Sequence, residues 1–418
     1  MSSCEQIAAL LQAGKPVALW GASNDAILLV NELWNRFKLA PHYMIDSDPH
    51  KQGKLFMGIP IVTFKQALAS KPDLSVYIVG SNYKYQITGT LINQLQFPKE
   101  RILNYEPVVW RKGCMFIENA LQCVGKHVCF CSSDFGKKRS PRVMFHDDYE
   151  RAVEEWSALR DNISSCLENE IPCSCTGCCC VKEDWYAANR QIHLVNYSEG
   201  GVCNFACIYC NAAAKHSKGV SDAEINLAEM LSVLEKKQLL AEDLHIDYSP
   251  GEPVLHPRKE RYYESFCGKY TTLVMTNASV YDPSLENCLS AGKAALCVSV
   301  DAGTADTFYQ VKGRNVFEKV CENLREYSRA ANGVVGLKYI FLPDVNDNKT
   351  DIEGFVQLCD AVRPAIVLLS YDIFHPVQTL TQHTFEMVQL LIAQLDEKGI
   401  VWKNVSDVIT RAFEGARL

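Results

Sequence analysis

The chain has 418 residues, an apolar fraction of 48% and a formal net charge of −7. This length allows two or three domains, each with a full core. The acidic balance argues against a general attraction for nucleic acid or anionic membranes. The short basic run GKKRS at 136–140 is interpreted as a solvated loop.

Cellular location follows from the apolar pattern and the cysteines. No apolar run approaches the ~20 residues that span a bilayer, and the N-terminal MSSCEQIAALLQAG does not have the pattern of a signal peptide. We therefore expect a cytoplasmic protein, in which cysteines stay reduced. Nine of the 19 cysteines fall between Cys166 and Cys210. Such clustering favours metal or iron–sulfur ligation over disulfides or scattered core thiols.

The first hundred residues alternate between strand and helix patterns. Strands are expected at 15–21, 42–48 and 74–80, and helical patterns follow the first and the third. This alternation predicts a doubly wound parallel sheet, which we assign to an N-terminal Rossmann-like domain over residues 1–105.

A ligand of this domain is not identified by its sequence. The first strand–helix turn, GASND at 21–25, has one Gly and one Ser where a dinucleotide fingerprint has three small residues. A phosphate or nucleotide pocket and an empty crevice both remain open. Asp46 follows the second strand, about where a ribose would be held.

A cysteine-rich insert is assigned to residues 106–190. Residues 104–147 contain four cysteines and have no clean periodicity, so we interpret them as a linker or a small irregular insert. Residues 148–170 have the pattern of an amphipathic helix, which leads directly into CSCTGCCC at 173–180.

A second alternation of strands and helices begins at residue 191. Six buried, β-branched strands separated by helical patterns predict a partial (β/α)6 barrel over residues 191–418, with C-terminal helices. In such a barrel the active site lies at the carboxyl ends of the strands. The six strands are expected at 192–197, 244–249, 272–277, 295–301, 335–342 and 365–371.

The loop CNFACIYC, residues 203–210, follows the first of these strands and supplies three thiols, from Cys203, Cys207 and Cys210. Structural zinc prefers four closed ligands, usually as two close pairs. An iron–sulfur cube also normally takes four cysteines. With three, one iron keeps an open position at which a substrate or cofactor could bind.

This second half of the chain, about 191–371, resembles the radical S-adenosylmethionine (radical SAM) superfamily. The three cysteines have the family's spacing, with the aromatic Tyr209 before the last. SPGEP stands at the family's Gly-Gly-Glu-Pro segment, with Pro250 in place of the first Gly. Three further segments are close to the family's wording, namely TNA at 276–278, SVDAGTADTFYQVKG at 299–313 and KYIFLPDVND at 338–347.

The resemblance implies a radical SAM barrel with a 4Fe–4S cluster that binds S-adenosylmethionine at its open iron. One electron, from an external donor of the flavodoxin or ferredoxin type, would then yield methionine and a 5′-deoxyadenosyl radical that abstracts hydrogen from a substrate. The enzyme would be an oxidoreductase in which the protein supplies position and excludes water.

Roles for further residues are also implied by the resemblance. Asn277 could instead cap a helix, and Lys338 could form a salt bridge on the barrel rim. Cys297 shares the face of Ser299 and is either a hydrogen donor to a product radical or a buried structural thiol. The implied contacts are Tyr209 with the adenine, Gly251 and Glu252 with the amino group, Asn277 with the ribose, Ser299 and Asp301 with the ribose or carboxylate, and Lys338 with the carboxylate.

The second cysteine group places five thiols within eight residues, too close in the chain for all to bind one metal. We expect an auxiliary iron–sulfur cluster here, and the segment resembles those of radical SAM maturases, where it often follows the barrel. A structural zinc knot or a redox dithiol is the alternative. The candidate metal ligands are Cys173, Cys175, Cys178 and Cys179, with Cys180 beside them and an upstream thiol from Cys166, Cys131 or Cys129.

Two substrate classes remain open for a radical SAM enzyme. The N-terminal domain favours a sugar, a nucleotide-linked compound or another small metabolite, whereas an auxiliary cluster favours a peptide or protein. A non-catalytic electron-transfer or zinc-binding protein is the alternative of another class. Cobalamin-dependent methyl transfer is disfavoured because the first domain lacks an Asp-x-His-x-x-Gly pattern. Nucleic acid and membranes are not expected partners.

Overall fold

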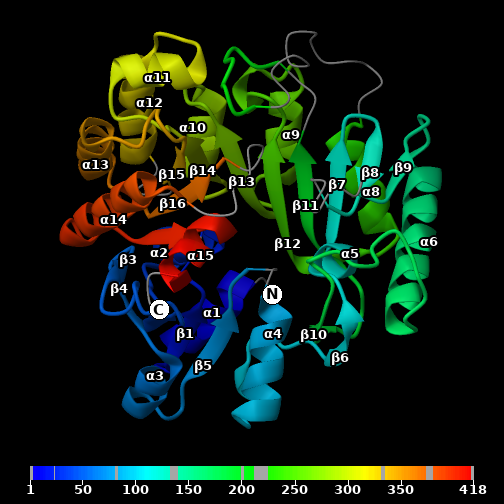
Figure 1. The fold of residues 1–418 in the computed structure, drawn as a ribbon. Helices are drawn as coiled ribbons and strands as arrows, with labels where there is room; N and C mark the ends of the chain where they lie inside the picture. The colour runs from blue at the N-terminus through cyan, green and yellow to red at the C-terminus, as the bar shows by residue number, and fades with distance from the viewer. Residues whose placement is uncertain are drawn as a thin grey trace.

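The computed structural model is of the mixed α/β class, as expected, with two sheets and a two-stranded ribbon (Figure 1). The smaller sheet has five strands and belongs to the N-terminal part of the chain, and the larger has ten. The structure describes residues 3–22, 24–80, 83–131, 140–198, 202–210, 225–330, 335–372 and 380–415.

The N-terminal sheet has the strand order β3-β4-β2-β1-β5, and all of its pairs are parallel except β3 with β4. Its strands are β1 (Val17–Trp20), β2 (Tyr43–Ile45), β3 (Leu55–Phe56), β4 (Ile59–Val62) and β5 (Ser75–Ile78).

Both faces of this sheet are covered. Val17 and Leu19 pack with residues of α1 (Ser3–Gln12) and α2 (Asn24–Phe37). Ala18 points to the other face, where it packs with residues of α3 (Phe64–Ser70) and of the turn η1 (Thr90–Gln94). Helices on both faces explain why the strands are apolar throughout rather than alternating.

Asp46, which follows β2, has its partners within the protein. Asp46 Oδ2 accepts a hydrogen bond from the Ala22 N–H at 3.1 Å and another from Lys51 Nζ at 2.6 Å. Lys51 is itself buried and also donates to the Ala22 carbonyl. The structure therefore gives the Asp46 carboxylate partners within the domain, where the sequence suggested a ribose. Ser23 of the same turn lies outside the described residues.

The larger sheet contains the six predicted barrel strands in chain order, all parallel (Figure 1). Helices between the strands cover the outer face, among them α8 (Leu227–Lys236), α11 (Ala305–Lys312), α12 (Phe317–Ala330) and α13 (Lys349–Val362). The strands are β11 (Ile192–Ser198), β12 (Leu240–Ser249), β13 (Thr271–Thr276), β14 (Ala295–Ser299), β15 (Val335–Phe341) and β16 (Ile366–Tyr371), and β17 (Trp402–Asn404) follows at the edge.

Part of the segment 104–147 belongs to the barrel sheet, so its interpretation as a linker or irregular insert is wrong. Strand β7 (Ala120–Val124) pairs in parallel with β11, and β8 (His127–Cys129) and β9 (Arg142–Met144) continue the sheet in antiparallel fashion. These strands have only three to five residues. Such short elements give too few alternations for a period to be recognised. Most of the basic run at 136–140 lies outside the described residues.

The predicted amphipathic helix is α6 (Tyr149–Glu168), whose buried side includes Trp156. Its indole stacks on Phe130 at a centroid distance of 5.2 Å. After α6 the chain passes through the cysteine-rich segment into β10 (Lys182–Ala187), which pairs antiparallel with β6 (Val108–Gly113).

The N-terminal domain packs against the amino ends of the barrel strands, so the strand arrows in Figure 1 point away from it. A buried polar network joins the two parts. Lys84 pairs with Glu106 and with Asp243 of β12, and His193 of β11 binds the same Asp243 carboxylate at 2.7 Å. The carboxyl ends of the strands, where a barrel active site is expected, are therefore remote from the N-terminal domain. The predicted domain boundaries stay a prediction.

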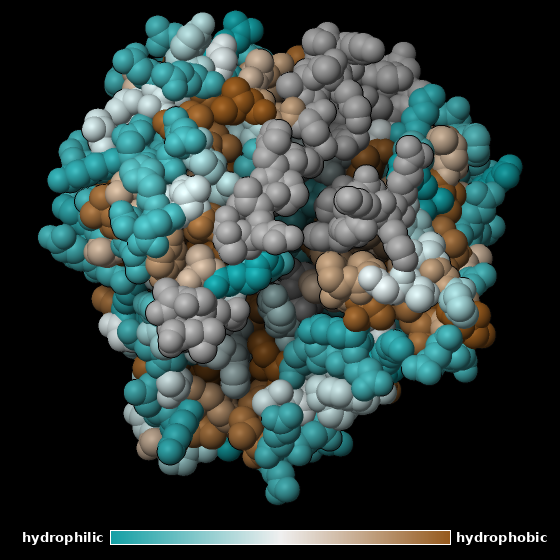
Figure 2. Space-filling model, viewed as in Figure 1, coloured by the Kyte–Doolittle hydropathy of each residue, from teal (hydrophilic) through white to brown (hydrophobic). Residues whose placement is uncertain are grey.

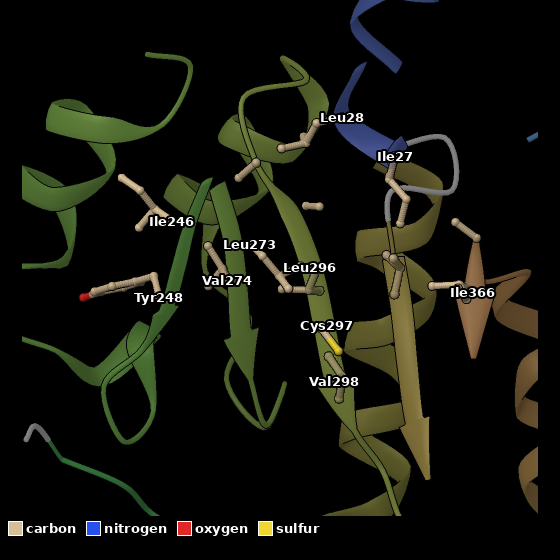
Figure 3. Close-up of a cluster of buried hydrophobic side chains, with 14 of the residues drawn as sticks. Ile27, Leu28, Ile246, Tyr248, Leu273, Val274, Leu296, Cys297, Val298 and Ile366 are labelled. Atoms are coloured by element: carbon tan, nitrogen blue, oxygen red, sulfur yellow. The ribbon is translucent and has the colours of Figure 1, made fainter. Parts of the chain in front are cut away.

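The main core runs from α2 into the barrel (Figure 3). Ile27 and Leu28 of α2 pack near Leu273 and Leu296 of the barrel strands. Over the visible face in Figure 2, most side chains are hydrophilic and the hydrophobic ones form separate patches. Within the described part of the chain, each helix is too short or too polar to cross a bilayer.

Candidate active site at the carboxyl ends of the barrel strands

The three-cysteine loop lies just beyond the carboxyl end of β11, as predicted, and is held by the end of α11. The Ala206 N–H donates to the Lys312 carbonyl at 3.0 Å, and the Ile208 N–H donates to the Val311 carbonyl at 3.0 Å. Gly313 has a φ of +69°, and a Cβ there would lie 3.2 Å from the Ala206 Cβ. Glycine therefore allows both the left-handed turn and the close approach of the loop.

The three thiols of this loop lie near one another. Burial raises the pKa of Cys203 to about 11, and the thiols of Cys207 and Cys210 add to the rise. Burial also raises the pKa of Cys207, against the opposing effect of the Lys312 ammonium. Thiols with raised pKa values stay protonated at neutral pH, so a bound metal centre is needed to hold them as thiolates.

Glu252 connects the SPGEP segment to two neighbouring loops. Its backbone N–H donates to the Val202 carbonyl at 2.9 Å, next to Cys203. Its carboxylate is fully buried and accepts hydrogen bonds from the Thr276 hydroxyl and, at 2.6 Å, from the Asn277 N–H. Gly251 precedes it with a φ of +53°, in the left-handed region that favours glycine. Because Glu252 has these internal partners, it positions the segment, and its contact with a ligand's amino group stays a prediction.

Glu252 should make the cofactor-free protein less stable as the pH rises. Burial raises the pKa of this carboxyl to about 7, above its ordinary value of 4.5. The folded state then binds the proton more tightly than the unfolded state, so the free energy of unfolding decreases as the pH rises from about 4.5 through about 7. The decrease is on the order of 3 kcal/mol. Urea denaturation measures the free energy of unfolding near pH 5 and near pH 8. The change in this free energy between the two pH values should be smaller for Glu252→Gln than for the unchanged protein, and an equal change would contradict this account.

Asn277 lies beside the first cysteine. Its amide nitrogen is 3.9 Å from Cys203 Sγ and donates to Asn204 Oδ1 at 2.9 Å. The Asn204 amide in turn donates to the Ser279 hydroxyl at 2.8 Å. The loop after β13 therefore supports the cysteine loop directly, and the alternative role of Asn277 as a helix cap is not what these contacts show.

A buried ion pair supports the other side of the loop. Asp301 is fully buried, and its Oδ2 accepts hydrogen bonds from Lys312 Nζ and, at 2.6 Å, from the Tyr209 hydroxyl. Its Oδ1 accepts from the Ile340 N–H at 2.7 Å. Lys312 also donates to the Tyr209 hydroxyl at 2.7 Å. Asp301 thus joins the cysteine loop to β14, β15 and α11, which positions the loop rather than exposing a carboxylate to a ligand.

Ser299 and Lys338 are register neighbours on β14 and β15. The Ser299 carbonyl accepts from Lys312 Nζ at 2.8 Å, whereas the Lys338 side chain is partly buried. Lys338 lies near enough to lower the pKa of Cys297, which burial raises to about 11. Cys297 is thus a protonated thiol among core side chains (Figure 3).

Sequence reasoning missed several residues that hold this site together. Lys312 lies in the segment that resembles the family, but no role was assigned to it. Asn204 lies within the cysteine loop itself, and its carbonyl accepts from Arg314 Nε at 2.8 Å. Lys312 could have been recognised because it is a lysine on the buried side of an amphipathic helix, where lysine is rare unless it is paired.

The comparisons agree with this geometry. Residues 198–358 match the family model described as "Radical SAM superfamily". A curated protein named GTPase Obg, from Brachyspira hyodysenteriae, is 27% identical over 177 residues, which is 40% of this chain and 26% of that protein. A GTP 3′,8-cyclase from Psychromonas ingrahamii is 26% identical over 172 residues, which is 39% of this chain and 49% of that protein. The chain thus spans about half, or less, of the length of these relatives.

Among solved structures, SuiB of Streptococcus suis has a TM-score of 0.41 and 11% identity, covering 63% of this chain and 56% of that one. Native anSMEcpe with bound AdoMet has a TM-score of 0.40 and 14% identity, covering 51% of this chain and 64% of that one. At such low scores this likeness adds nothing to the family match.

Proposed function

Residues 198–358 match the radical SAM family model, and from this premise we propose that the protein is a radical SAM enzyme that abstracts hydrogen from a nucleotide-linked or sugar-linked small molecule. The observation that carries the enzymatic part is the three-thiol loop beyond β11, whose ligands lie close together and whose two sides are held by separate buried networks. A non-catalytic carrier of electrons or zinc would not require this arrangement.

The residues present fit the family's cofactors, a 4Fe–4S cluster and S-adenosylmethionine. Cys203, Cys207 and Cys210 would hold the cluster, because their thiols are mutually close and partly accessible. When bound, these cofactors supply a carbon-centred radical strong enough to abstract hydrogen. The chain's own contribution is to fix the loop, shield the site and orient the nucleoside.

Several contacts to S-adenosylmethionine are part of the proposal. Gly251 and the adjacent backbone would meet the amino group, with Glu252 fixing their conformation. Tyr209 would present its ring toward the adenine, since its hydroxyl is already bound by Asp301 and Lys312. The same proposal assigns Asn277 to the ribose, the carbonyl side of Ser299 to the ribose or carboxylate, and Lys338 to the carboxylate.

The proposed substrate class is supported by relatives whose name specifies a nucleotide. Proteins named GTP 3′,8-cyclase, a name that specifies a purine nucleotide, are 21–26% identical over 165–172 residues of this chain. Asp46 is bound by Ala22 and Lys51 of the N-terminal part, so this carboxylate gives no support for a ribose at that position. The substrate would instead enter the barrel above the carboxyl ends of the strands.

Radical SAM chemistry needs a reductant, and we propose that an external flavodoxin or ferredoxin supplies the electron to the cluster. Cys207 and Cys210 are partly exposed, which supports a proposed cluster within reach of a docked small redox protein.

The proposal is tested by following hydrogen transfer. The reconstituted protein is reduced anaerobically with dithionite and mixed with S-adenosylmethionine and substrates whose sugars are fully deuterated: GTP, other nucleoside triphosphates and nucleotide sugars. We expect at least one compound to raise 5′-deoxyadenosine release about tenfold or more and to transfer deuterium into it. Release of unlabelled 5′-deoxyadenosine with every compound would reject the substrate class, and no release at all would reject the reaction.

A further inference from the structure

Two cysteine-containing segments that are far apart in the sequence meet at the β6–β10 ribbon. Gly113 at the end of β6 pairs with Lys182 at the start of β10. Cys114 directly follows the first of these residues, and Cys180 lies just before the second. An antiparallel ladder in this register brings the two cysteines to the same end of the ribbon. Cys114 therefore joins the cysteine-rich segment although about sixty residues of sequence separate them.

The thiols at this end of the ribbon influence one another. Burial raises the pKa of Cys114 to about 12, and the thiols of Cys175 and Cys131 add to the rise. Cys175 is affected in the same way by Cys173 and then by Cys131, and Cys180 by Cys114, Cys179 and Cys178. Cys114 thus lies near all three of the others. Cys131 extends beyond β8, whose antiparallel pairing with β7 directs it toward the same end of the sheet.

We propose that Cys114, Cys131, Cys175 and Cys180 bind a second iron–sulfur cluster at the amino end of the barrel. This proposal does not depend on the substrate class above. It replaces Cys173, Cys178 and Cys179 of the sequence-based ligand set with thiols from three separate segments. The Cys166 thiol instead donates to Asn162 Oδ1 at 3.4 Å, and Cys129 lies beside Cys123.

The spacing of the thiols favours a cluster over a single zinc ion. Zn–S bonds of about 2.3 Å place tetrahedral sulfurs within about 4 Å of one another. In the described part of the chain, the one cysteine trio whose sulfurs all lie within 4.8 Å is Cys178–Cys180, and three consecutive residues cannot readily surround one ion. The four proposed ligands do not form such a group, and neither do the three of the radical SAM loop. A cube offers a separate iron to each thiolate, so its four ligands need not converge on one ion.

This second cluster would not share the first one's pocket. The cysteine-rich segment lies at the amino ends of the strands, where β10 leads into β11, whereas the three-cysteine loop follows the carboxyl end of β11 (Figure 1). Strand β11 has seven residues, which span roughly 20 Å. The second cluster is therefore too far from the cofactor to contact it, while exposed Cys179 shows that this end reaches the surface.

The test uses a protein in which the first cluster cannot form. In the background Cys203→Ala, Cys207→Ala and Cys210→Ala, anaerobic reconstitution with iron and sulfide should leave about four irons and about four sulfides per chain, with the Mössbauer spectrum of a cube. Adding Cys114→Ser and Cys180→Ser should remove this iron, whereas the matched addition of Cys4→Ser and Cys359→Ser, two buried thiols elsewhere, should not. A background protein that holds no iron, or that holds zinc in its place, overturns the proposal.

Alkylation gives a second measurement that needs no further substitution. The background protein is treated with iodoacetamide before and after reconstitution, and each cysteine is quantified by mass spectrometry. Cys131, Cys175 and Cys180, all partly accessible, should become protected on reconstitution, whereas Cys166 and Cys179 should react as before. Equal labelling of these two groups in the reconstituted protein contradicts the ligand assignment even if iron is retained.

Discussion

Replacement of Cys203, Cys207 and Cys210 together by alanine should abolish 5′-deoxyadenosine release and lower the iron content by about four atoms per chain. Cys207 and Cys210 lie close enough to Cys203, at the carboxyl end of β11, to raise its pKa. Together the three thiols would hold the cluster at which electron transfer to S-adenosylmethionine would occur. A single replacement should have nearly the full effect on activity, because residues that act as one unit are not additive. Iron analysis, S-adenosylmethionine cleavage and circular dichroism are measured on the same samples.

The matched control is Cys321→Ala, which removes a buried thiol of α12. It should keep its full iron content and its activity, with at most a loss of about 1–3 kcal/mol in stability. If the triple variant retained S-adenosylmethionine cleavage at more than a trace, the assignment of the cofactor site would be wrong. If the control lost iron as completely as the triple variant, the effect would reflect folding rather than ligation.

The barrel strands could be predicted from sequence because their own residues carry the signal. Each is a run of buried, β-branched side chains of five to ten residues, flanked by helical patterns. The loop of Cys203 was equally visible, since its three ligands lie within eight residues of one another. Local patterns of this kind survive folding because they depend on the chain's own periodicity.

Other parts of the site depend on contacts that no local pattern contains. Cys114 reaches the cysteine-rich segment through the register of β6 with β10, and the pairing of β7 with β11 likewise joins distant residues. Lys51 lies five residues after Asp46, yet the sequence does not show that its ammonium occupies the place beside that carboxylate. Tertiary pairing of this kind, rather than residue type, decides which of the predicted residues already have partners within the protein.

The buried ion pair of Lys312 and Asp301 should contribute separately to the stability of the fold and to the position of the cysteine loop. The side chains are 2% and 0% exposed. Asp301→Asn or Lys312→Met alone leaves an uncompensated charge in the core and should lower the free energy of unfolding by about 3–5 kcal/mol. The double variant removes both charges, so its loss should be well below the sum of the two single losses. Urea denaturation followed by both circular dichroism and tyrosine fluorescence measures each value and tests whether the two signals change together.

Iron retention should not recover with stability in the double variant. Tyr209, in the cysteine loop, receives hydrogen bonds from Lys312 and donates to Asp301, and the double variant removes the ammonium and weakens the acceptor. We therefore expect faster loss of cluster iron to a chelator in the double variant, despite its partly restored stability. Lys349→Met, which removes an exposed lysine paired with Glu353 at 3.6 Å, should change neither quantity appreciably. Iron retention that rose in step with stability would mean that the ion pair supports the fold alone and does not hold the cysteine loop.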